Sequence, residues 1–112
     1  MLKKAFRLQK KEDFERVFRS GKPLFFGALG CKMAQNSLSH VRLGFSLSKK
    51  HVANIVERNR IRRVLSAAFS QALSTGKTPP FDVVFFTVKK VPKKDLLTFA
   101  SAAQSVVEYI NQ

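Results

Sequence analysis

A dense group of arginine side chains lies at the centre of the sequence, and phosphate binding is the chemistry that suits it. The run KKHVANIVERNRIRRVLSAAF, residues 49–69, holds six lysines and arginines in its first fifteen positions but only one acid, Glu57. Guanidinium groups present rigid forks of N–H donors that match phosphate oxygens. The candidate surface for binding a polyanion consists of Arg58, Asn59, Arg60, Arg62 and Arg63.

The same run predicts the helix that carries these side chains. Apolar residues recur at helical spacing and predict a buried face: Ile61, Val64, Leu65, Ala68, Phe69, Ala72 and Leu73. At about 100° per residue, the opposite side holds Asn59, Arg60, Arg63, Ser66 and Ser70. Arg58 and Arg62 fall near the apolar edge, from which long arginine stems can reach a neighbouring surface.

Net charge supports a polyanionic partner. The 112 residues carry a formal charge of +14, which exceeds what solubility requires. Between Arg16 and Phe81 the only acid is Glu57, so the middle of the chain is the electropositive part. Nucleic acid is the commonest partner for such a charge, and its binding gains from counterion release.

Catalytic constellations are not evident. A nuclease needs clustered carboxylates for metal ions, or a histidine pair placed to activate water. The seven acids are scattered, His40 and His51 are isolated, and Cys31 has no base partner. We therefore predict no catalytic residue, no metal site and no cofactor bound by the protein itself. His51 is interpreted as a phosphate neighbour or a helix-start residue, and Cys31 as a small strand residue.

Two phenylalanines allow two interpretations. Phe14 and Phe18 lie four residues apart in the segment KEDFERVFRSG, which predicts a short helix that ends at Gly21. Their rings either pack in the core or stack on unpaired nucleotides, and phenylalanine serves both purposes.

The remaining pattern predicts a small α+β fold. Residues 24–33 suggest two short strands with a turn near Gly27, and the polar residues 35–39 suggest a hairpin loop. Alternation over residues 41–48 predicts a strand with Val41, Leu43, Phe45 and Leu47 inward and a shallow polar floor on its other face. Residues 81–88 predict an interior strand, and residues 95–110 a last helix with apolar positions Leu96, Phe99, Ala100, Ala103, Val106, Val107 and Ile110.

Together these elements predict a two-layer α/β sandwich in the order αβββαβα, with about four strands in a mixed sheet and three helices. We expect residues 1–112 to form a single domain, with residues 1–10 as a basic, flexible arm. A single cysteine, no apolar region typical of a signal peptide and no long apolar run predict a cytoplasmic protein without a membrane span.

The run SLSKKHVANIVERNRIRRVLSAAF, preceded by VRLGF, closely resembles the signature of the bacterial ribonuclease P protein subunit. KEDFERVF near the start, the later strand DVVFFTVKK and the chain length fit as well. The resemblance implies a small protein that works with a large catalytic RNA to remove the 5′ leader of precursor tRNA, leaving a 5′-phosphate. It also implies that the RNA holds the catalytic Mg²⁺, and that a left-handed crossover joins two parallel strands, against the general rule.

The resemblance further implies roles for particular residues. The helix with Arg58, Asn59, Arg60, Arg62 and Arg63 would dock on the catalytic RNA. A groove between the first helix and the sheet would receive the single-stranded leader at Phe14, Phe18, Ser46, Ser48, Lys49 and Lys50, with Lys89 and Lys90 near its rim. The implied partners are RNase P RNA and precursor tRNA, with no membrane and no obligate protein partner.

Two positions depart from the family pattern. Ser66 stands where relatives often carry a basic residue, and Cys31 stands where some relatives carry an aromatic that faces the leader. Alternation sends the face with Leu29, Cys31 and Met33 inward, whereas the resemblance sends it toward the groove. Both assignments stay open for this strand.

Two other functions compete with this one. A non-enzymatic RNA-binding module, such as a ribosomal protein, shares the size, the charge and the α+β architecture. A freestanding nuclease is disfavoured by the scattered acids.

Overall fold

The computed structural model describes residues 6–38, 40–73, 80–92 and 96–110. The order of the elements is the predicted αβββαβα. They are α1 (Lys11–Ser20), β1 (Lys22–Phe26), β2 (Leu29–Gln35), β3 (Arg42–Ser46), α2 (Ile55–Leu73), β4 (Phe81–Thr87) and α3 (Leu96–Ile110). The predicted α+β class, with four strands and three helices in this order, is confirmed.

The four strands form one mixed sheet in the order β1-β2-β4-β3. β1 and β2 form an antiparallel hairpin, and its turn places Gly27 at φ 65°, a conformation that favours glycine. β4 runs antiparallel to β2 and parallel to β3, so α2 lies in the crossover between two parallel strands. The handedness of this crossover stays a prediction from the family resemblance.

The predicted hairpin loop at residues 35–39 is wrong, because β2 and β3 are not neighbours. β4 lies between them, so it is an interior strand, as its apolar sequence predicts. The segment that crosses over the start of β4 is fixed by Asn36. Its backbone N–H donates to the carbonyl of Pro80, and its amide donates to the carboxylate of Asp82.

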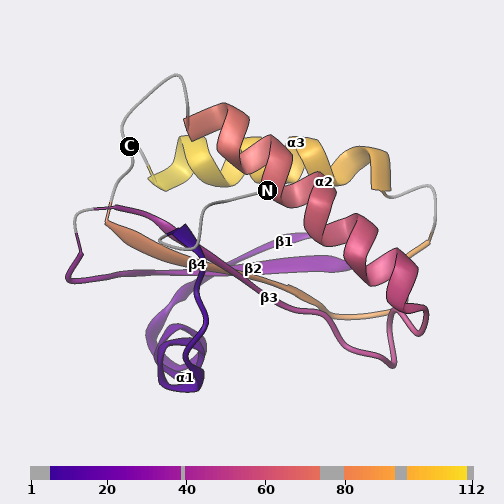
Figure 1. Cartoon of the computed structure of the whole chain (residues 1–112), viewed down its shortest axis with the longest axis horizontal. Coiled ribbons are helices and arrows are strands. Elements are labelled where there is room, and N and C mark those ends of the chain that lie inside the picture. Colours follow the sequence, from indigo (N-terminus) through magenta and orange to yellow (C-terminus); the bar gives the residue numbers. More distant parts are fainter. Residues whose placement is uncertain (1–5, 39, 74–79, 93–95, 111–112) are drawn as a thin grey trace.

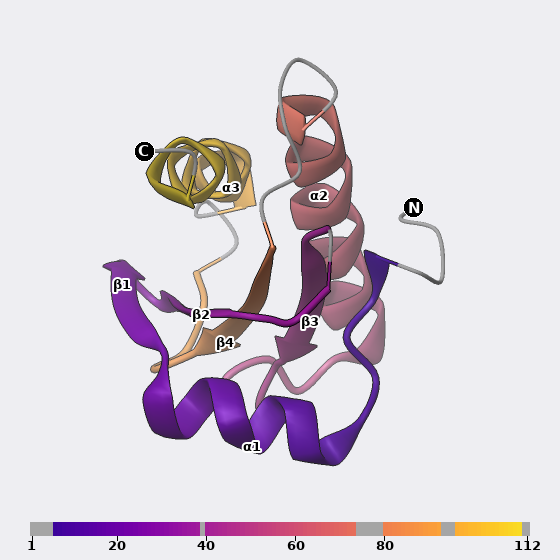
Figure 2. The same cartoon turned by 90° about the vertical axis from the view of Figure 1, so that its left-hand side faces the viewer.

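Helices cover both faces of the sheet (Figures 1 and 2). α2 and α3 lie side by side on one face and form the second layer of the predicted sandwich, and α1 lies alone against the opposite face. The large hydrophobic cluster fills the space between the sheet and the α2–α3 pair. A smaller cluster of Leu8, Val17 and Val84, with Phe14 and Phe18 packed against it, joins α1 to the other face.

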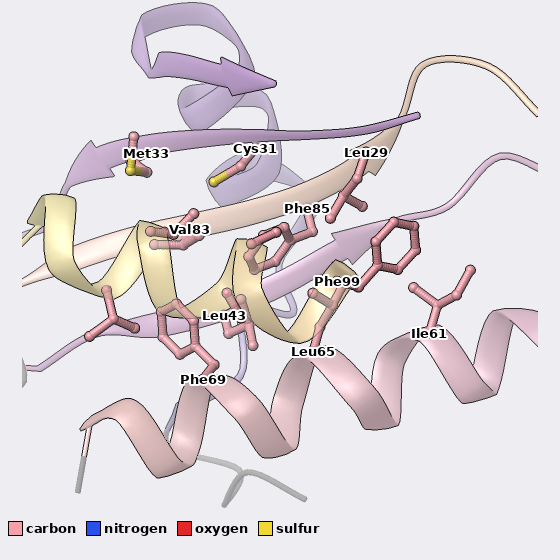
Figure 3. Packing of buried hydrophobic residues seen from close by; sticks show 14 of the residues in the cluster. Leu29, Cys31, Met33, Leu43, Ile61, Leu65, Phe69, Val83, Phe85 and Phe99 are labelled. Carbon is pink, nitrogen blue, oxygen red and sulfur yellow. The ribbon is translucent and has the colours of Figure 1, made fainter. Parts of the chain in front are cut away.

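The large cluster confirms the predicted inward face of α2. Ile61, Leu65 and Phe69 point from α2 toward the sheet (Figure 3), and each is at most 1% exposed. Phe69 meets Phe85 of β4 edge to face, with ring centroids 6.4 Å apart. Val64 and Ala68 are partly buried in the same cluster. The side chains of Ala72 and Leu73 lie outside the described residues.

The predicted inward positions are confirmed on β3 and differ at one residue of α3. On β3 the inward alternation holds, since Val41 and Leu43 are buried and Phe45 and Leu47 pack against the same cluster. On α3 the prediction for Ala100 is wrong: Ala100 is exposed, and Ala102, two positions further along, is buried in the cluster instead, because the helix is covered along one side only. The side chain of Leu96 lies outside the described residues.

The structure describes the predicted basic arm, residues 1–10, from residue 6 onward. Residues 1–5 lie outside the described residues. Leu8 is 5% exposed, and its backbone N–H donates to the carbonyl of Leu43 at 2.9 Å, so the end of the arm runs along the outer edge of β3. None of the helices in the described part of the chain is long and apolar enough to cross a membrane.

Candidate nucleic-acid interface

The side of α2 that faces away from the sheet carries part of the predicted arginine surface. Asn59, Arg60 and Arg63 are exposed there, because Ile61 and Leu65 bind the other side of the helix to the core. Asn54 caps the helix with its side-chain oxygen, which accepts the backbone N–H of Val56 at 2.7 Å. The helix is therefore fixed at its start and along its length, and its outward cations keep a defined spacing.

Arg58 belongs to the predicted set but faces inward. Its side chain is among the buried ones, at 7% exposure, and the Nη1 atom donates to the carbonyls of Val52 and Ala53 at 2.7 and 2.9 Å. These bonds fix the segment that leads into α2. Arg58 therefore stabilises the loop before α2.

Arg62 lies at the border between the exposed side and the buried side of α2. It is half-buried, and its guanidinium donates to the side-chain oxygen of Asn59 at 2.9 Å. This bond spans one turn of the helix and orients both side chains. Ser66, one turn further along, was predicted to face outward, and that prediction is wrong, because Ser66 is 4% exposed. Its small side chain lines a cavity together with residues of β3 and the arm, at the lateral border of α2.

The predicted leader residues at the ends of the strands gather at one end of the sheet. Lys49 and Lys50 follow β3, Lys89 and Lys90 follow β4, and all four are exposed. Because β3 and β4 are parallel neighbours, both strands end on the same side. The backbone N–H of Val91 donates to the carbonyl of His51 at 3.3 Å and joins the two loops.

The turn that holds the first lysine pair is closed by hydrogen bonds. The side-chain oxygen of Ser48 accepts the backbone N–H of Lys50 at 3.1 Å, and the Thr87 hydroxyl accepts the N–H of Ser48 at 3.0 Å. Nδ1 of His51 lies 2.9 Å from the same hydroxyl. His51 thus ties the turn to the end of β4, a structural position that the sequence did not predict. Ser46, also a predicted leader residue, is exposed at the end of β3.

α1 places its two phenylalanines on the same face of the sheet as Gly44 and Ser46. Phe14 and Phe18 are half-buried. The Phe14 ring rests directly on Gly44, where a Cβ atom would approach it to 2.8 Å. Phe18 meets Phe86 edge to face at 5.6 Å, and Lys32 Nζ lies 5.6 Å from the Phe18 centroid. Each ring is therefore both a packing element and partly open to a ligand.

A buried carboxylate fixes α1 to the sheet. Asp82 of β4 is fully buried and accepts two hydrogen bonds from Arg42 of β3 at 2.8 Å each, in a bidentate pair. It also accepts hydrogen bonds from Arg16 of α1 and from Asn36. Asp13 of α1 lies 3.4 Å from Nη1 of Arg42, which closes the network.

The pKa of Asp82 shows which effects prevail in this network. Burial opposes ionisation and by itself raises the pKa. The hydrogen bonds from Arg42 and Asn36 and the charges of Arg42 and Arg16 outweigh it, so the pKa of Asp82 lies below its ordinary value. The same bonds raise the pKa of Arg42. Sequence reasoning missed this network, because residues 16, 36, 42 and 82 meet only through the strand order.

The structure settles which face of β2 meets α1. Leu29, Cys31 and Met33 lie in the large cluster on the α2–α3 side, so alternation gave the correct face. Cys31 therefore does not face the predicted leader groove; β2 places Gly30 and Lys32 on that side instead. Burial raises the pKa of the Cys31 thiol to about 12, which keeps it protonated and unreactive.

Among the described residues, no group of three or more histidine, cysteine, aspartate and glutamate side chains could hold a metal ion. Two of the described acids, Asp13 and Asp82, are paired with arginines.

A small α+β protein with exposed cations on one helix and at one end of its mixed sheet has the features of a basic RNA-binding protein. A family model described as Ribonuclease P matches residues 2–111. The ribonuclease P protein component of Legionella pneumophila (strain Corby) is 37% identical over 92 residues, which are 82% of this chain and 77% of that protein. The chain belongs to the ribonuclease P protein family.

Two further comparisons agree. The ribonuclease P protein component of Haemophilus influenzae (strain PittGG) is 33% identical over 99 residues, which are 88% of this chain and 78% of that protein. The solved structure of the Staphylococcus aureus RNase P protein superimposes with a TM-score of 0.70 at 25% identity, and the match covers 96% of this chain and 94% of that one. The predicted fold and family are thus confirmed.

Proposed function

We propose that the chain is the protein subunit of ribonuclease P, which binds the catalytic RNA and the 5′ leader of precursor tRNA and assists removal of the leader. The observation that carries this proposal is the arrangement of the cations in a member of this family. Arg60 and Arg63 are exposed on α2, on one side of the sheet, whereas the exposed lysines that follow β3 and β4 lie at one end of the sheet. One chain can thus hold two RNA segments at once.

The α2 surface docks on RNase P RNA. Asn59, Arg60 and Arg63 offer donors at helical spacing to the phosphates of a folded backbone. Arg62 contributes from the border of the helix, and Arg58 acts by fixing the approach to α2. Hydrolysis of the phosphodiester bond and the Mg²⁺ that it requires belong to the RNA, and pairing of Asp13 and Asp82 with arginines supports this assignment. The place of action is the cytoplasm.

The α1 face receives the single-stranded leader. Phe14 and Phe18 offer partly open rings for stacking, and Ser46 and Ser48 are small polar residues at the end of β3 and in the turn after it. Lys49, Lys50, Lys89 and Lys90 attract the phosphates of the leader at the end of the sheet. Contacts of this kind tolerate different sequences, as a protein that serves many tRNA precursors requires.

Identification of the RNA that co-purifies with the chain from cells tests the proposal. A tagged chain should retain one RNA of the RNase P type together with precursor tRNAs. Recovery of ribosomal subunits in place of that RNA would favour the alternative, a ribosomal protein. Cleavage of precursor tRNA by the chain alone, free of RNA, would favour a freestanding nuclease.

Phe14→Ala is expected to reduce the preference for precursor tRNA over mature tRNA by about 1–3 kcal/mol, the range for removing one base–aromatic stack. The measurement is the pair of dissociation constants of the reconstituted ribonucleoprotein for the two tRNAs. Because Phe14 also covers Gly44, its thermal unfolding has to be recorded in parallel. A variant that unfolds, or that keeps its full preference while folded, would contradict the leader role.

The double variant Lys49→Ala/Lys50→Ala tests the same face without touching the core, since both side chains are exposed. We expect weaker binding of precursor tRNA and a salt slope lower by about 0.7 for each lysine that contacts a single-stranded phosphate. Lys22→Ala, on the far strand β1, is the matched control and should leave the slope unchanged.

A further inference from the structure

A cavity of about 240 Å³ lies at the outer edge of β3, between the arm, α1 and α2. Six of its lining residues are Arg7, Phe14, Gly44, Phe45, Arg62 and Ser66. The volume is below the range of about 300–1,000 Å³ for drug-sized ligands. It suits one planar ring system and excludes a base pair.

The wall formed by β3 offers hydrogen-bonding groups. The carbonyl of Leu43 accepts the N–H of Leu8 across the outer edge of the strand. Alternate residues of a strand direct their backbone groups to the same edge, so the N–H and C=O of Phe45 face this edge as well. No partner for them is found among the described residues. An edge strand thus presents one donor and one acceptor beside an apolar cavity.

The two remaining features are charge and aromatic surface. Arg7 is exposed at the rim and Arg62 is half-buried there, so the opening has a positive charge without a nearby acid in its lining. Phe14 and Phe45 supply ring surface from opposite faces of β3. Every nucleobase combines a flat apolar face, an adjacent donor and acceptor on its pairing edge, and a phosphate on either side. The cavity offers an aromatic ring for the flat face, backbone groups for the pairing edge, and arginines for the phosphates.

We propose that this cavity holds one unpaired nucleobase of RNase P RNA, with its ring against Phe45, its pairing edge on the backbone of Phe45, and its phosphates at Arg7 and Arg62. The pocket role rests on the proposed function, because it takes RNase P RNA as the partner. Arg62 favours the catalytic RNA over the leader, since it borders the Arg60 and Arg63 surface, whereas the leader lysines lie beyond the end of β3.

Filling the cavity should weaken RNA binding without removing a charge. Ser66→Leu places a larger side chain on the wall of the cavity, and Ser70→Leu, one turn along the same helix but exposed, is the matched control. We expect Ser66→Leu to raise the dissociation constant for RNase P RNA about tenfold with an unchanged salt slope. Ser70→Leu should bind as the original chain does. Ser66→Val adds less volume and serves if Ser66→Leu fails to fold.

Chemical probing of the RNA locates the base. Dimethyl sulfate methylates adenine N1 and cytosine N3, and a carbodiimide modifies uracil N3 and guanine N1, so both reagents report on free pairing edges. RNase P RNA without precursor tRNA should contain one base that the original chain and Ser70→Leu protect but Ser66→Leu leaves reactive.

Three results would overturn the pocket role: equal affinity of Ser66→Leu and the original chain, no base with this protection pattern, or a pattern found only in the leader of added precursor tRNA. If the chain stimulates leader removal and one of these results is obtained, only the pocket role fails. If the chain does not bind RNase P RNA at all, the proposed function fails with it.

Discussion

Asp82→Asn is expected to lower the free energy of unfolding by about 3 kcal/mol at neutral pH. The substitution keeps the size of the side chain but removes the charge that faces Arg42 and Arg16, and loss of one partner of a buried ion pair costs about 3–5 kcal/mol. We expect a loss at the lower end of this energy range because Arg16 is 36% exposed and water partly solvates its charge. Urea unfolding followed by circular dichroism measures the change.

The difference in the free energy of unfolding between the original chain and Asp82→Asn should decrease as the pH falls. The pKa of Asp82 is lowered in the folded protein, so the unfolded chain takes up a proton first as the pH falls. The carboxylate therefore stabilises the fold above the unfolded pKa of about 3.9, and this stabilisation is lost below that pH. The stability gap between the original chain and Asp82→Asn should narrow in the same interval.

Glu15→Gln is the matched control for Asp82→Asn. Glu15 lies on α1, is 57% exposed, and pairs with Lys11 at 3.9 Å, so its replacement should change stability little. Because Arg16 and Asp13 join α1 to the network, Asp82→Asn should also weaken the preference for precursor tRNA over mature tRNA. Unfolding of Asp82→Asn at the same urea concentration as the original chain would contradict the assigned role of the network.

Arg60→Ala and Arg63→Ala are each expected to weaken binding of RNase P RNA by about 1–3 kcal/mol, the range for hydrogen bonds to charged groups. Both side chains are exposed, so the fold should persist. Each variant should also lower the dependence of the binding constant on salt, because each removes a cation that displaces counterions. Filter binding at several salt concentrations gives both quantities.

Lys22→Ala again provides the comparison, since it removes one exposed charge from β1, at the edge of the sheet away from α2. An unchanged salt slope in both arginine variants would contradict the docking role of α2. Arg58→Ala should differ from both Arg60→Ala and Arg63→Ala. It removes the bonds to Val52 and Ala53 and is expected to lower stability as well as affinity.

The sequence predicted best what a periodic pattern determines locally. The buried side of α2 follows from the spacing of Ile61, Leu65 and Phe69, which one helix repeats at every turn. The faces of β2 and β3 follow from alternation, and alternation placed Cys31 correctly where the family resemblance did not.

What the sequence did not predict depends on contacts between distant segments. The short polar loop after β2 suggested a hairpin, but β4 lies between β2 and β3, and the sequence of the loop does not indicate this arrangement. The role of Asp82 depends on the position of β4 beside β3, because this arrangement brings Arg42 within hydrogen-bond distance of Asp82. A lone acid at the second position of an apolar strand indicates none of these contacts.

The borders of α2 show a second limit. Projection around a helix separates inward from outward positions, but Arg58 and Ser66 lie where the helix meets a loop and an edge strand. Arg58 points inward because backbone carbonyls before the helix accept its donors. Ser66 is buried because the arm and β3 reach around that side of the helix. Neither neighbour is visible from helical periodicity.

The central claim is that the chain supports leader removal by a catalytic RNA. The most direct measurement is the rate at which a bacterial RNase P RNA cleaves precursor tRNA at limiting Mg²⁺, with and without the purified chain. The chain should restore cleavage at the mature 5′ end and yield a 5′-phosphate, and Arg60→Ala/Arg63→Ala should require more protein for the same rate. Absence of stimulation at every Mg²⁺ and salt concentration would contradict the claim.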